Sequence, residues 1–357
     1  MSDKIKIPFI SIILPAFNEE AIIEKSLEIL IGYLRSQEGK YNWEILIIND
    51  GSSDATGTIA DNQAMKYDHI RVIHHPVNLN LGRAIQTGFR NAHGDIIVVL
   101  DIDLSYSADH IGRLVEKQLE TDADIVIASP YMKGGKVSNV PFRRALLSKC
   151  VNRFMRFAAQ EKCNTFTGMV RAYKSSFIKN LNLKTKDYEI NPEILYKAMI
   201  LRARIVEIPG HLDWSFQNKV GSKRTSGMKL FRGFFSGLMS GFIFRPYVFF
   251  ITFGAVLLLI ALYIIVWIFI NTFQVMPQII VDPQFIDDRF SMAIGQVFKA
   301  RPHAFIVGGI TLLLSIQVLS LGFLSLQSKR YFEELFHLNS TVLQQVNKKN
   351  NDTGIEN

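Results

Sequence analysis

The sequence predicts an α/β domain followed by interfacial amphipathic helices and two transmembrane helices. Short runs rich in Val, Ile and Leu alternate with helical segments up to residue 130, which is typical of a parallel sheet covered by helices on both faces. Two uncharged apolar stretches, residues 247–270 and 304–327, each exceed the roughly 20 residues that cross a bilayer. The composition agrees, because 48% of the residues are hydrophobic although 20% are charged.

Five apolar runs are expected to form buried parallel strands in the first domain. They are rich in β-branched residues, as strands are. Between them, residues 19–35 and 54–67 have apolar side chains at helical spacing. A doubly wound sheet of this kind binds ligands at the carboxyl ends of its strands, so side chains that follow a strand are the candidates for function. The expected strands are residues 9–14, 44–48, 70–73, 95–100 and 124–128.

The composition changes again near residue 227. Residues 228–244 are rich in Phe and Gly and include Lys229 and Arg232, a composition typical of amphipathic helices at a membrane surface. The chain therefore divides into six expected parts. These are the α/β domain (1–226), interfacial helices (227–246), a first span (247–271), a connecting loop (272–303), a second span (304–327) and a tail (328–357).

The charges around the two spans predict their orientation. Six Lys or Arg residues between positions 219 and 245 precede the first span, and Lys329 and Arg330 follow the second. The connecting loop has three acidic and three basic residues. By the positive-inside rule, the first domain and the tail lie in the cytoplasm and the connecting loop lies outside. Residues 1–8 lack the apolar run of a signal peptide, which agrees with this orientation.

Charge, cysteine and histidine content exclude several other classes. The formal net charge is +8, but much of the excess lies beside the spans, where a basic residue near anionic lipid contributes about 1 kcal/mol. We therefore expect a membrane partner and no nucleic acid. Cys150 and Cys163 fall in the expected cytoplasmic part, where thiols stay reduced, so no disulfide is expected. His74 and His75 lack metal-ligand spacing to other His or Cys residues and are interpreted as structural.

Asp101 and Asp103 form the first candidate site. They flank one residue at the end of an expected strand, and alternate side chains of an extended segment lie on one face. Both carboxylates can therefore reach one cation, and Mg²⁺ or Mn²⁺ is suited to one or two carboxylates plus substrate phosphates. Such an ion would neutralise a diphosphate leaving group. The alternative is an ordinary turn, in which Asp is common.

Asp50 is the second candidate. It lies in Asn-Asp-Gly-Ser-Ser-Asp (residues 49–54), directly after the second expected strand. Gly51 permits a close backbone approach, and the Asp50 carboxylate can accept hydrogen bonds from a base or a ribose. Asp54 is expected to be the N-cap of the next helix. A plain strand–turn–helix connection is the alternative.

Four segments together resemble the inverting family-2 glycosyltransferases with a GT-A fold, and most of all the polyprenyl-phosphate sugar synthases of the dolichyl-phosphate mannose synthase type. They are Pro-Ala-Phe-Asn-Glu-Glu (15–20), Asn-Asp-Gly-Ser-Ser-Asp (49–54), Asn-Leu-Gly-Arg-Ala (80–84) and Asp-Ile-Asp (101–103). The resemblance covers about residues 8–230. It implies that Asp101 and Asp103 are the catalytic pair that holds the metal diphosphate. The residues implied in nucleotide-sugar binding are Pro15, Ala16, Asn18, Glu19, Asp50, Arg83 and Asp101.

The resemblance also implies an acceptor-phosphate site. Residues 131–136 with Arg143 and Arg144 resemble a stretch that lies near the acceptor phosphate in relatives. Lys223 and Arg224 belong to a segment that resembles the acceptor loop. Arg suits bidentate phosphate binding and Lys supplies a point charge. The alternative for each residue is interfacial charge attracted to anionic lipid.

The sequence departs from the family pattern at the candidate base. Residues 164–171 read Asn-Thr-Phe-Thr-Gly-Met-Val-Arg and hold no carboxylate where many relatives have one. Asp187, Glu189 and Glu193 are nearby alternatives. A phosphate acceptor has a second pKa of about 6, so transfer to it does not require a strong general base.

The resemblance implies transfer of one hexose, with inversion, from a UDP- or GDP-sugar to undecaprenyl or dolichyl phosphate at the cytoplasmic membrane face. Two other hypotheses stay open. A processive polysaccharide synthase would carry a Gln-x-x-Arg-Trp motif, and the sequence has no Arg-Trp pair. A membrane scaffold without turnover is suggested by the missing carboxylate near Asn164. Small residues within 233–241 suit close helix packing, so a homo-oligomer is also among the expectations.

Overall fold

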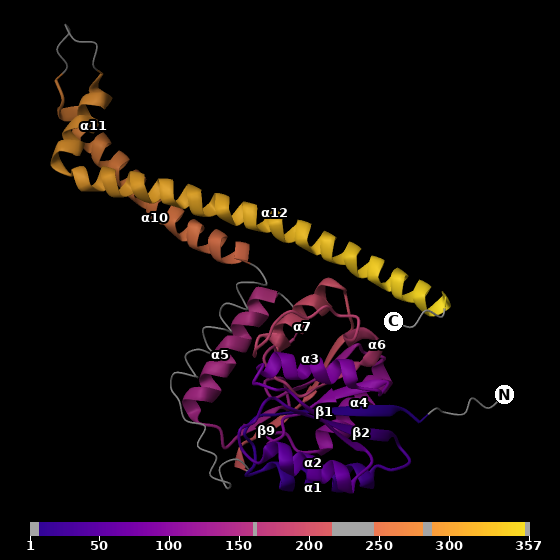
Figure 1. Ribbon diagram of the computed structural model, residues 1–357. Coiled ribbons are helices and arrows are strands. Elements are labelled where there is room, and N and C mark those ends of the chain that lie inside the picture. The colour runs from indigo at the N-terminus through magenta and orange to yellow at the C-terminus, as the bar shows by residue number, and fades with distance from the viewer. Residues whose placement is uncertain (1–6, 160–162, 216–245, 281–287, 354–357) are drawn as a thin grey trace. The chain divides into compact units, whose positions relative to one another are not determined.

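The computed structural model describes residues 7–159, 163–215, 246–280 and 288–353 (Figure 1). The chain divides into two compact units, Met1–Phe244 with Phe336–Asn357 and Arg245–Leu335. The interfacial helices expected at 227–246 lie almost entirely outside the described residues. The same holds for Lys223 and Arg224 of the expected acceptor loop.

A seven-stranded sheet forms the centre of the first unit, in the order β3-β2-β1-β4-β7-β5-β8. β1, β2, β3 and β4 are parallel neighbours, and β5 is parallel to β8. β7 runs antiparallel between β4 and β5. The strands are β1 (Phe9–Ala16), β2 (Asn42–Asn49), β3 (Ile70–His74), β4 (Ile96–Val99), β5 (Ile125–Ser129), β7 (Arg171–Lys174) and β8 (Ile205–Pro209).

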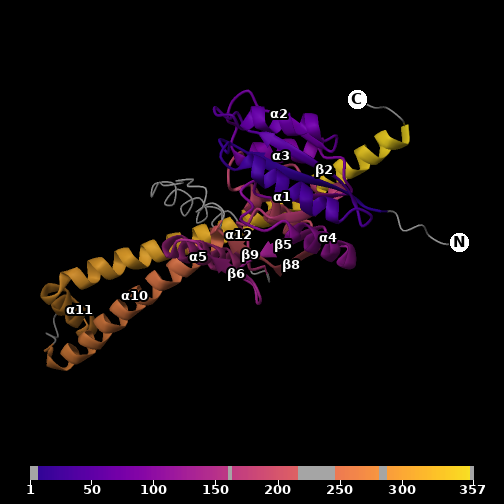
Figure 2. The same ribbon diagram turned by 90° about the horizontal axis from the view of Figure 1, so that it is seen from below.

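Side chains of β1 alternate between two buried clusters, one on each face of the sheet. Ile10 and Ile12 join a cluster with apolar residues of α1, α2 and α4, whereas Ile13 joins a cluster with residues of α3, α5, α6 and α7. This alternation follows from the two-residue period of a strand, and Figures 1 and 2 show helices on both faces. The helices are α1 (Ile23–Ser36), α2 (Thr56–Lys66), α3 (Leu81–Asn91), α4 (Asp109–Thr121), α5 (Phe142–Ala159), α6 (Ser175–Ile178) and α7 (Ile190–Ile200).

The expected α/β class is confirmed, and strands lie at all five of the expected runs. The other four strands, β6 to β9, were not predicted because they are short or interrupted by polar residues. β7 reads Arg-Ala-Tyr-Lys, which is no apolar run, yet it separates β4 from β5. β6 (Lys136–Ser138) and β9 (His211–Asp213) pair in parallel as a separate two-stranded sheet.

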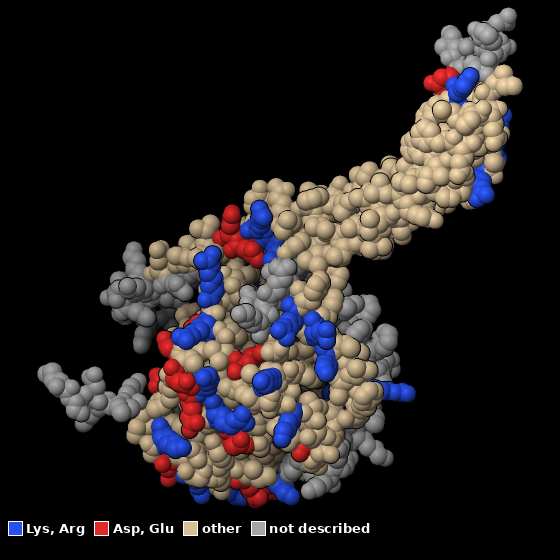
Figure 3. Space-filling model, turned by 180° about the vertical axis from the view of Figure 1, so that it is seen from behind, with Lys and Arg blue, Asp and Glu red and all other residues tan. Residues whose placement is uncertain are grey.

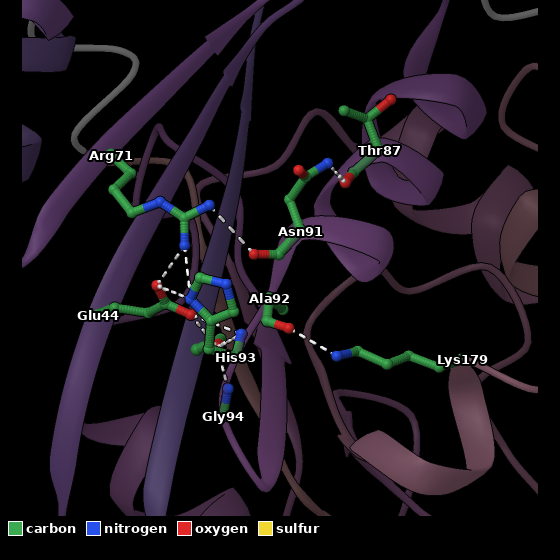
Figure 4. Close-up of polar contacts among 9 residues, drawn as sticks. Glu44, Arg71, Thr87, Asn91, Ala92, His93, Gly94 and Lys179 are labelled. Carbon is green, nitrogen blue, oxygen red and sulfur yellow. Dashed lines mark hydrogen bonds and ion pairs between the residues drawn. The ribbon is translucent and has the colours of Figure 1, made fainter. Parts of the chain in front are cut away.

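A buried polar cluster ties together the amino-terminal parts of β1 and β2 (Figure 4). Glu44 Oε1 accepts hydrogen bonds from Ser11 Oγ (2.6 Å) and from the His93 backbone N–H (2.7 Å), and Glu44 Oε2 accepts one from Arg71 (3.0 Å). Burial alone would raise the pKa of Glu44, but these partners together lower it. The cluster lies away from the strand ends that carry the candidate site.

The second unit consists of helices, the last of which continues past Leu335, where this unit ends. α10 (Pro246–Val275) continues into a short 3₁₀ helix, η1 (Met276–Gln278), and is followed by α11 (Arg289–Ala300) and α12 (Pro302–Thr353). Helical segments Pro246–Gln278 and Pro302–Asn339 are long and apolar enough to cross a membrane. Figure 3 shows that the surface of these long helices carries few charged side chains, in contrast to the surface of the α/β domain.

Three glycines allow α10 and α12 to pack closely. A Cβ at Gly254 would lie 2.8 Å from Leu319 Cγ, and one at Gly322 would lie 2.8 Å from Ile251 Cγ1. Gly308 packs in the same way on α10. Small residues at such contacts are typical of helix pairs in membranes. Within the segment expected as a loop, α11 is helical, and its Phe290 ring lies 6.3 Å from the Phe269 ring of α10.

Candidate functional site

The polar segments of the sequence meet where the central strands end. The register pairs Ala16 with Asn49 and Asn49 with His74, so β1, β2 and β3 end at the same level. β4, the other neighbour of β1, ends at Val99, two residues before Asp101. The segments that follow these strands therefore share one edge of the sheet, the edge at which sheets of this kind bind ligands.

Hydrogen bonds join the segment after β1 to the segment after β2. The Asn18 N–H donates to Ser52 Oγ (3.0 Å), and Asn18 Oδ1 accepts from the Ser53 N–H (2.9 Å). The buried Glu19 donates its N–H to Thr56 Oγ1 (2.7 Å). Asn18 has a φ of 54°, a left-handed conformation that Asn tolerates. Both residues thus fix the connection between the two segments, while Pro15 is half-buried at the end of β1 and Ala16 is buried.

Asp54 was expected at the N-cap of α2 but lies one residue before it. α2 starts at Thr56, with Ala55 at the N-cap position, and the cap side chain makes no hydrogen bond. Asp54 Oδ1 nevertheless accepts the Thr56 N–H (3.0 Å), so it still satisfies a donor of the first turn. The N-cap prediction is therefore wrong by one residue, and the role of the carboxylate is as expected.

Asp50 is buried and held by His75. Nδ1 of His75 lies 2.6 Å from Asp50 Oδ1, which also accepts the Leu79 N–H (3.0 Å). Nε2 of His75 lies 3.0 Å from Thr87 Oγ1. Two partners therefore fix the orientation of the Asp50 carboxylate, and the Thr87 contact fixes the His75 ring. The structural interpretation of His75 omitted this link, because nothing in the sequence pairs positions 50 and 75.

Only glycine fits at position 51, because the backbone of residues 77–78 lies directly against it. Its φ is +66°, and a Cβ there would lie 2.4 Å from the carbonyl carbon of Val77, so any larger residue would displace the segment that follows β3. The close backbone approach predicted for Gly51 is thus made to residues 77–78.

Arg83 lies near the amino end of α3, half-buried, and donates to Gln86 Oε1 (3.3 Å). The same end of α3 packs against a loop that is distant in sequence. A Cβ at Gly82 would lie 2.6 Å from the Thr185 carbonyl oxygen, and Gln86 Nε2 donates to that oxygen (2.7 Å). Residues 185–187 therefore line the helix on which Arg83 lies.

Asp101 and Asp103 lie close enough to interact, but they lie in a turn that follows β4 and not on the face of an extended strand. Asp103 is 4% exposed, and its Oδ1 accepts the Ser105 N–H (2.9 Å). Leu104 has a φ of 47° and donates its N–H to the Asp101 carbonyl (3.1 Å), so the chain turns sharply after the pair. Burial and the Asp103 carboxylate raise the pKa of Asp101 well above its usual value.

This pair suits a divalent cation. Two carboxylates that repel each other would be neutralised by an ion between them. Within the described parts of the chain, no group of three or more His, Cys, Asp or Glu side chains could hold a metal ion. A metal on Asp101 and Asp103 would therefore take its other ligands from substrate phosphates or water, which is the usual coordination of Mg²⁺.

Basic and aromatic side chains approach the same pair. The Arg144 guanidinium carbon lies 4.4 Å from the centre of the Trp214 ring. Burial lowers the pKa of Arg144, and the nearby Tyr188 and Asp103 oppose that shift. Of the two arginines predicted for an acceptor phosphate, the structure thus brings Arg144 within electrostatic reach of the pair. Arg143 is exposed, and no described contact links it to the pair.

Glu193, one of the three candidate bases, is already bound to backbone groups. Glu193 accepts the Lys184 and Thr185 N–H groups, and its pKa is lowered by hydrogen bonds from Lys197 and Thr185, which outweigh its burial. Glu207 of β8 accepts the Asn164 N–H and side-chain amide (2.9 and 2.7 Å). A carboxylate therefore reaches the segment that lacks one in sequence, but its oxygens already bind the backbone there.

The sequence profile of the family described as "Glycosyl transferase family 2" matches residues 11–181. The chain is 32% identical over 203 residues to the dolichol-phosphate mannosyltransferase of Pyrococcus furiosus, a match that covers 56% of this chain and 55% of that protein. It therefore spans about half the length of that relative. It is also 31% identical over 231 residues to dolichyl-phosphate beta-glucosyltransferase ALG5A of Trichomonas vaginalis, covering 62% of this chain and 69% of that protein.

A solved structure is also similar. The crystal structure of glucosyl-3-phosphoglycerate synthase from Mycobacterium tuberculosis, in complex with Mn²⁺, UDP-glucose and phosphoglyceric acid, has a TM-score of 0.45 and 20% identity. That similarity covers 58% of this chain and 70% of that one. The profile match and the identity to the relatives show that the chain belongs to glycosyl transferase family 2.

Proposed function

We propose that the chain transfers one hexose, with inversion, from a UDP- or GDP-sugar to a polyprenyl phosphate such as undecaprenyl or dolichyl phosphate. The observation that carries this proposal is the approach of Arg144 to the Asp101–Asp103 pair. A metal-bound diphosphate on the pair and an acceptor phosphate on the arginine would then lie near each other, as transfer of the sugar between them requires. The names of both relatives describe transfer to a dolichol phosphate, which supports this acceptor class.

The donor side is proposed to consist of the strand-end residues. Asp50 accepts hydrogen bonds from the base or ribose, in the orientation that His75 gives it. Pro15, Ala16, Asn18, Glu19 and Arg83 complete the nucleotide site. Asp101 and Asp103 would hold Mg²⁺ or Mn²⁺. Bound there, the ion would neutralise the departing diphosphate.

The acceptor side is proposed to use basic residues and no strong general base. An acceptor phosphate oxygen attacks the anomeric carbon as the bond to the nucleotide diphosphate oxygen breaks, and this single displacement inverts the anomeric configuration. The phosphate is already ionised near neutral pH, so Arg144 needs only to position it through bidentate hydrogen bonds. Arg143, Lys223 and Arg224 are proposed as further phosphate contacts.

The two long apolar helices are proposed to anchor this reaction to the lipid. In that arrangement residues 1–226 form the cytoplasmic catalytic domain, 227–246 lie in the interface, 247–271 and 304–327 span the bilayer, 272–303 lie outside, and 328–357 form a cytoplasmic tail. The charge distribution supports this orientation. The acceptor's lipid chain would then stay in the bilayer while its phosphate reaches the active site.

The test is product formation by the full chain in lipid nanodiscs. UDP- and GDP-hexoses would be supplied with Mg²⁺ or Mn²⁺ and either undecaprenyl phosphate, dolichyl phosphate or the soluble phosphate ester glycerol 3-phosphate. We expect a lipid carrying one inverted hexose and no glycerol product. Polymer would favour a processive synthase. A folded protein that yields no product with any donor would support the scaffold hypothesis and contradict the proposal.

A further inference from the structure

We infer that the loop 182–189 is a wall of the sugar site, that Tyr188 contacts the transferred hexose, and that Glu193 is the positioning residue that holds this loop. The inference rests on the proposed function and adds a specificity element to it. Its basis is the set of contacts that fix residues 182–187 of the loop and leave the aromatic side chain of Tyr188 exposed.

Glu193 binds the backbone near the beginning of the loop. Its carboxylate oxygens accept the Lys184 N–H (3.0 and 3.2 Å) and the Thr185 N–H (2.8 Å). Hydrogen bonds from backbone N–H groups to an ionised carboxylate are about twice as strong as neutral ones. The Glu193 carboxylate, in the first turn of α7, therefore binds backbone N–H groups of the preceding loop.

Lys197 completes this fastening one helical turn later. Its Nζ lies 2.5 Å from Glu193 Oε1 and also donates to the Asn182 carbonyl oxygen. The side chains of Lys197 and Glu193 are only 9% and 13% exposed. Loss of either partner would leave the other charge buried without its counter-charge, which is strongly unfavourable. The pair is thus the structural base of the loop.

The loop is also fixed on the nucleotide side. The Thr185 carbonyl oxygen accepts from Gln86 Nε2 (2.7 Å), and the backbone of residues 185–187 lies directly against Gly82 at the amino end of α3. Arg83, proposed for the nucleotide, is the next residue of α3. The loop therefore spans from the proposed nucleotide site to α7.

Tyr188 projects from the part of the loop that these contacts leave uncovered. It is 70% exposed. It lies within electrostatic reach of both Asp101 and Arg144. A group near both a metal-bound diphosphate and an acceptor phosphate would lie close to the sugar being transferred. The Tyr ring offers that sugar an apolar face, and its hydroxyl offers a hydrogen bond.

The first experiment measures the contributions of the Tyr188 ring and of its hydroxyl separately. Tyr188→Ala and Tyr188→Phe would be compared with the wild type for the binding of UDP, UDP-glucose, GDP and GDP-mannose by calorimetry. We expect Tyr188→Ala to lose about tenfold in affinity for the nucleotide-sugar that the wild type prefers, an effect of the size of one aromatic contact. Affinity for the free nucleotide should stay within about twofold. Tyr188→Phe removes only the hydroxyl, so its loss of affinity measures the contribution of the hydroxyl hydrogen bond.

The second experiment tests the positioning role of Glu193. Glu193→Gln should show the same selective loss for the nucleotide-sugar, with faster amide hydrogen exchange at residues 184–188. Glu120→Gln is the matched control, since Glu120 pairs with Lys117 on an exposed helix face and should change neither. The double variant Glu193→Gln with Lys197→Met removes both charges, and we expect it to be more stable than Glu193→Gln alone.

Two results would overturn the inference. One is a Tyr188→Ala variant in which free nucleotide and nucleotide-sugar weaken equally, and the other is one in which only the KM for the polyprenyl phosphate changes. Because the binding arm needs no acceptor, it remains decisive even if lipid transfer is not observed. Conversely, lipid transfer with unchanged sugar discrimination in Tyr188→Ala would contradict the inference and leave the proposed function intact.

Discussion

Single side chains at the ends of β1, β2 and β4 carry the proposed chemistry. Asp101 and Asp103 are close enough for one to raise the pKa of the other. An arrangement of like charges is unfavourable by itself, so it is expected where a cation binds. Asp50 has the opposite environment, since its partners are hydrogen-bond donors.

Asp103→Asn should abolish most activity. The substitution keeps the size of the side chain but removes a charged metal ligand, and loss of such electrostatic stabilisation typically lowers kcat by about 10²-fold or more. Turnover with the preferred donor checks this. Asp68→Asn, at an exposed position, is the control and should retain full activity. Wild-type turnover in a folded Asp103→Asn protein would remove the pair from the mechanism.

The orientation of Asp50 by His75 can be tested with two substitutions at one position. His75→Leu leaves the buried carboxylate without its side-chain donor, and an unmet partner of this kind costs about 1–3 kcal/mol. We expect about a tenfold rise in donor KM. His75→Asn places an amide N–H near the position of Nδ1 and should recover most of the affinity. Equal KM values for the two variants would show that the hydrogen bond is irrelevant to the donor.

At the scale of elements, the position of α3 depends on a glycine. Gly82→Ala would place a Cβ 2.6 Å from the Thr185 carbonyl oxygen, and such overpacking against backbone costs about 1–3 kcal/mol. Gly32→Ala in α1 is the matched control, because its Cβ would meet nothing within 4 Å. That control should instead stabilise by about 0.5–1 kcal/mol. Urea unfolding measures both, and equal stabilities would contradict the α3–loop contact.

The connection between α4 and β9 should make stability depend on pH. His110 is buried, and its Nε2 accepts the His211 N–H (3.1 Å), which requires the neutral ring. Burial lowers the pKa of His110, against the opposing effects of the Ser107 carbonyl and Asp109; Arg113 and His211 lower it further. With a folded pKa below the unfolded value of about 6.5, the unfolded state binds the proton more readily. Stability is therefore full above pH 6.5 and is lost as pH falls.

Thermal unfolding between pH 8 and pH 5 measures this dependence. His110→Gln can accept the same N–H without titrating, so its Tm should fall less over this range than that of the wild type. Identical pH profiles would assign the loss to other groups.

At the scale of the whole molecule, the proposed topology predicts which cysteines react from each side of the membrane. Cys150 is exposed, whereas Cys163 is buried and burial raises its pKa to about 12, so only Cys150 should be reactive. A membrane-impermeant maleimide should label Cys150 only after permeabilisation. In a Cys150→Ser background, Gln296→Cys on α11 should label in intact cells. The reverse pattern would invert the assigned orientation.

Local patterns determined much of this protein from the sequence alone. Continuous apolar runs located five strands, because a sheet covered on both faces must be apolar throughout. Uncharged stretches located two candidate membrane helices, because length and composition are sufficient for that prediction. The clusters at strand ends made Asp50, Asp101 and Asp103 candidates, since parallel strands bring their carboxyl ends to one edge.

Only the tertiary structure decided which distant residues meet. It inserted the polar strand β7 between β4 and β5 and placed His75 on Asp50. It also brought Glu207 to Asn164 and Thr185 to Gly82. Such contacts join positions tens of residues apart, and no periodicity links them. Their physical cause is the need of buried polar groups for partners wherever the fold places them, which a one-dimensional pattern does not record.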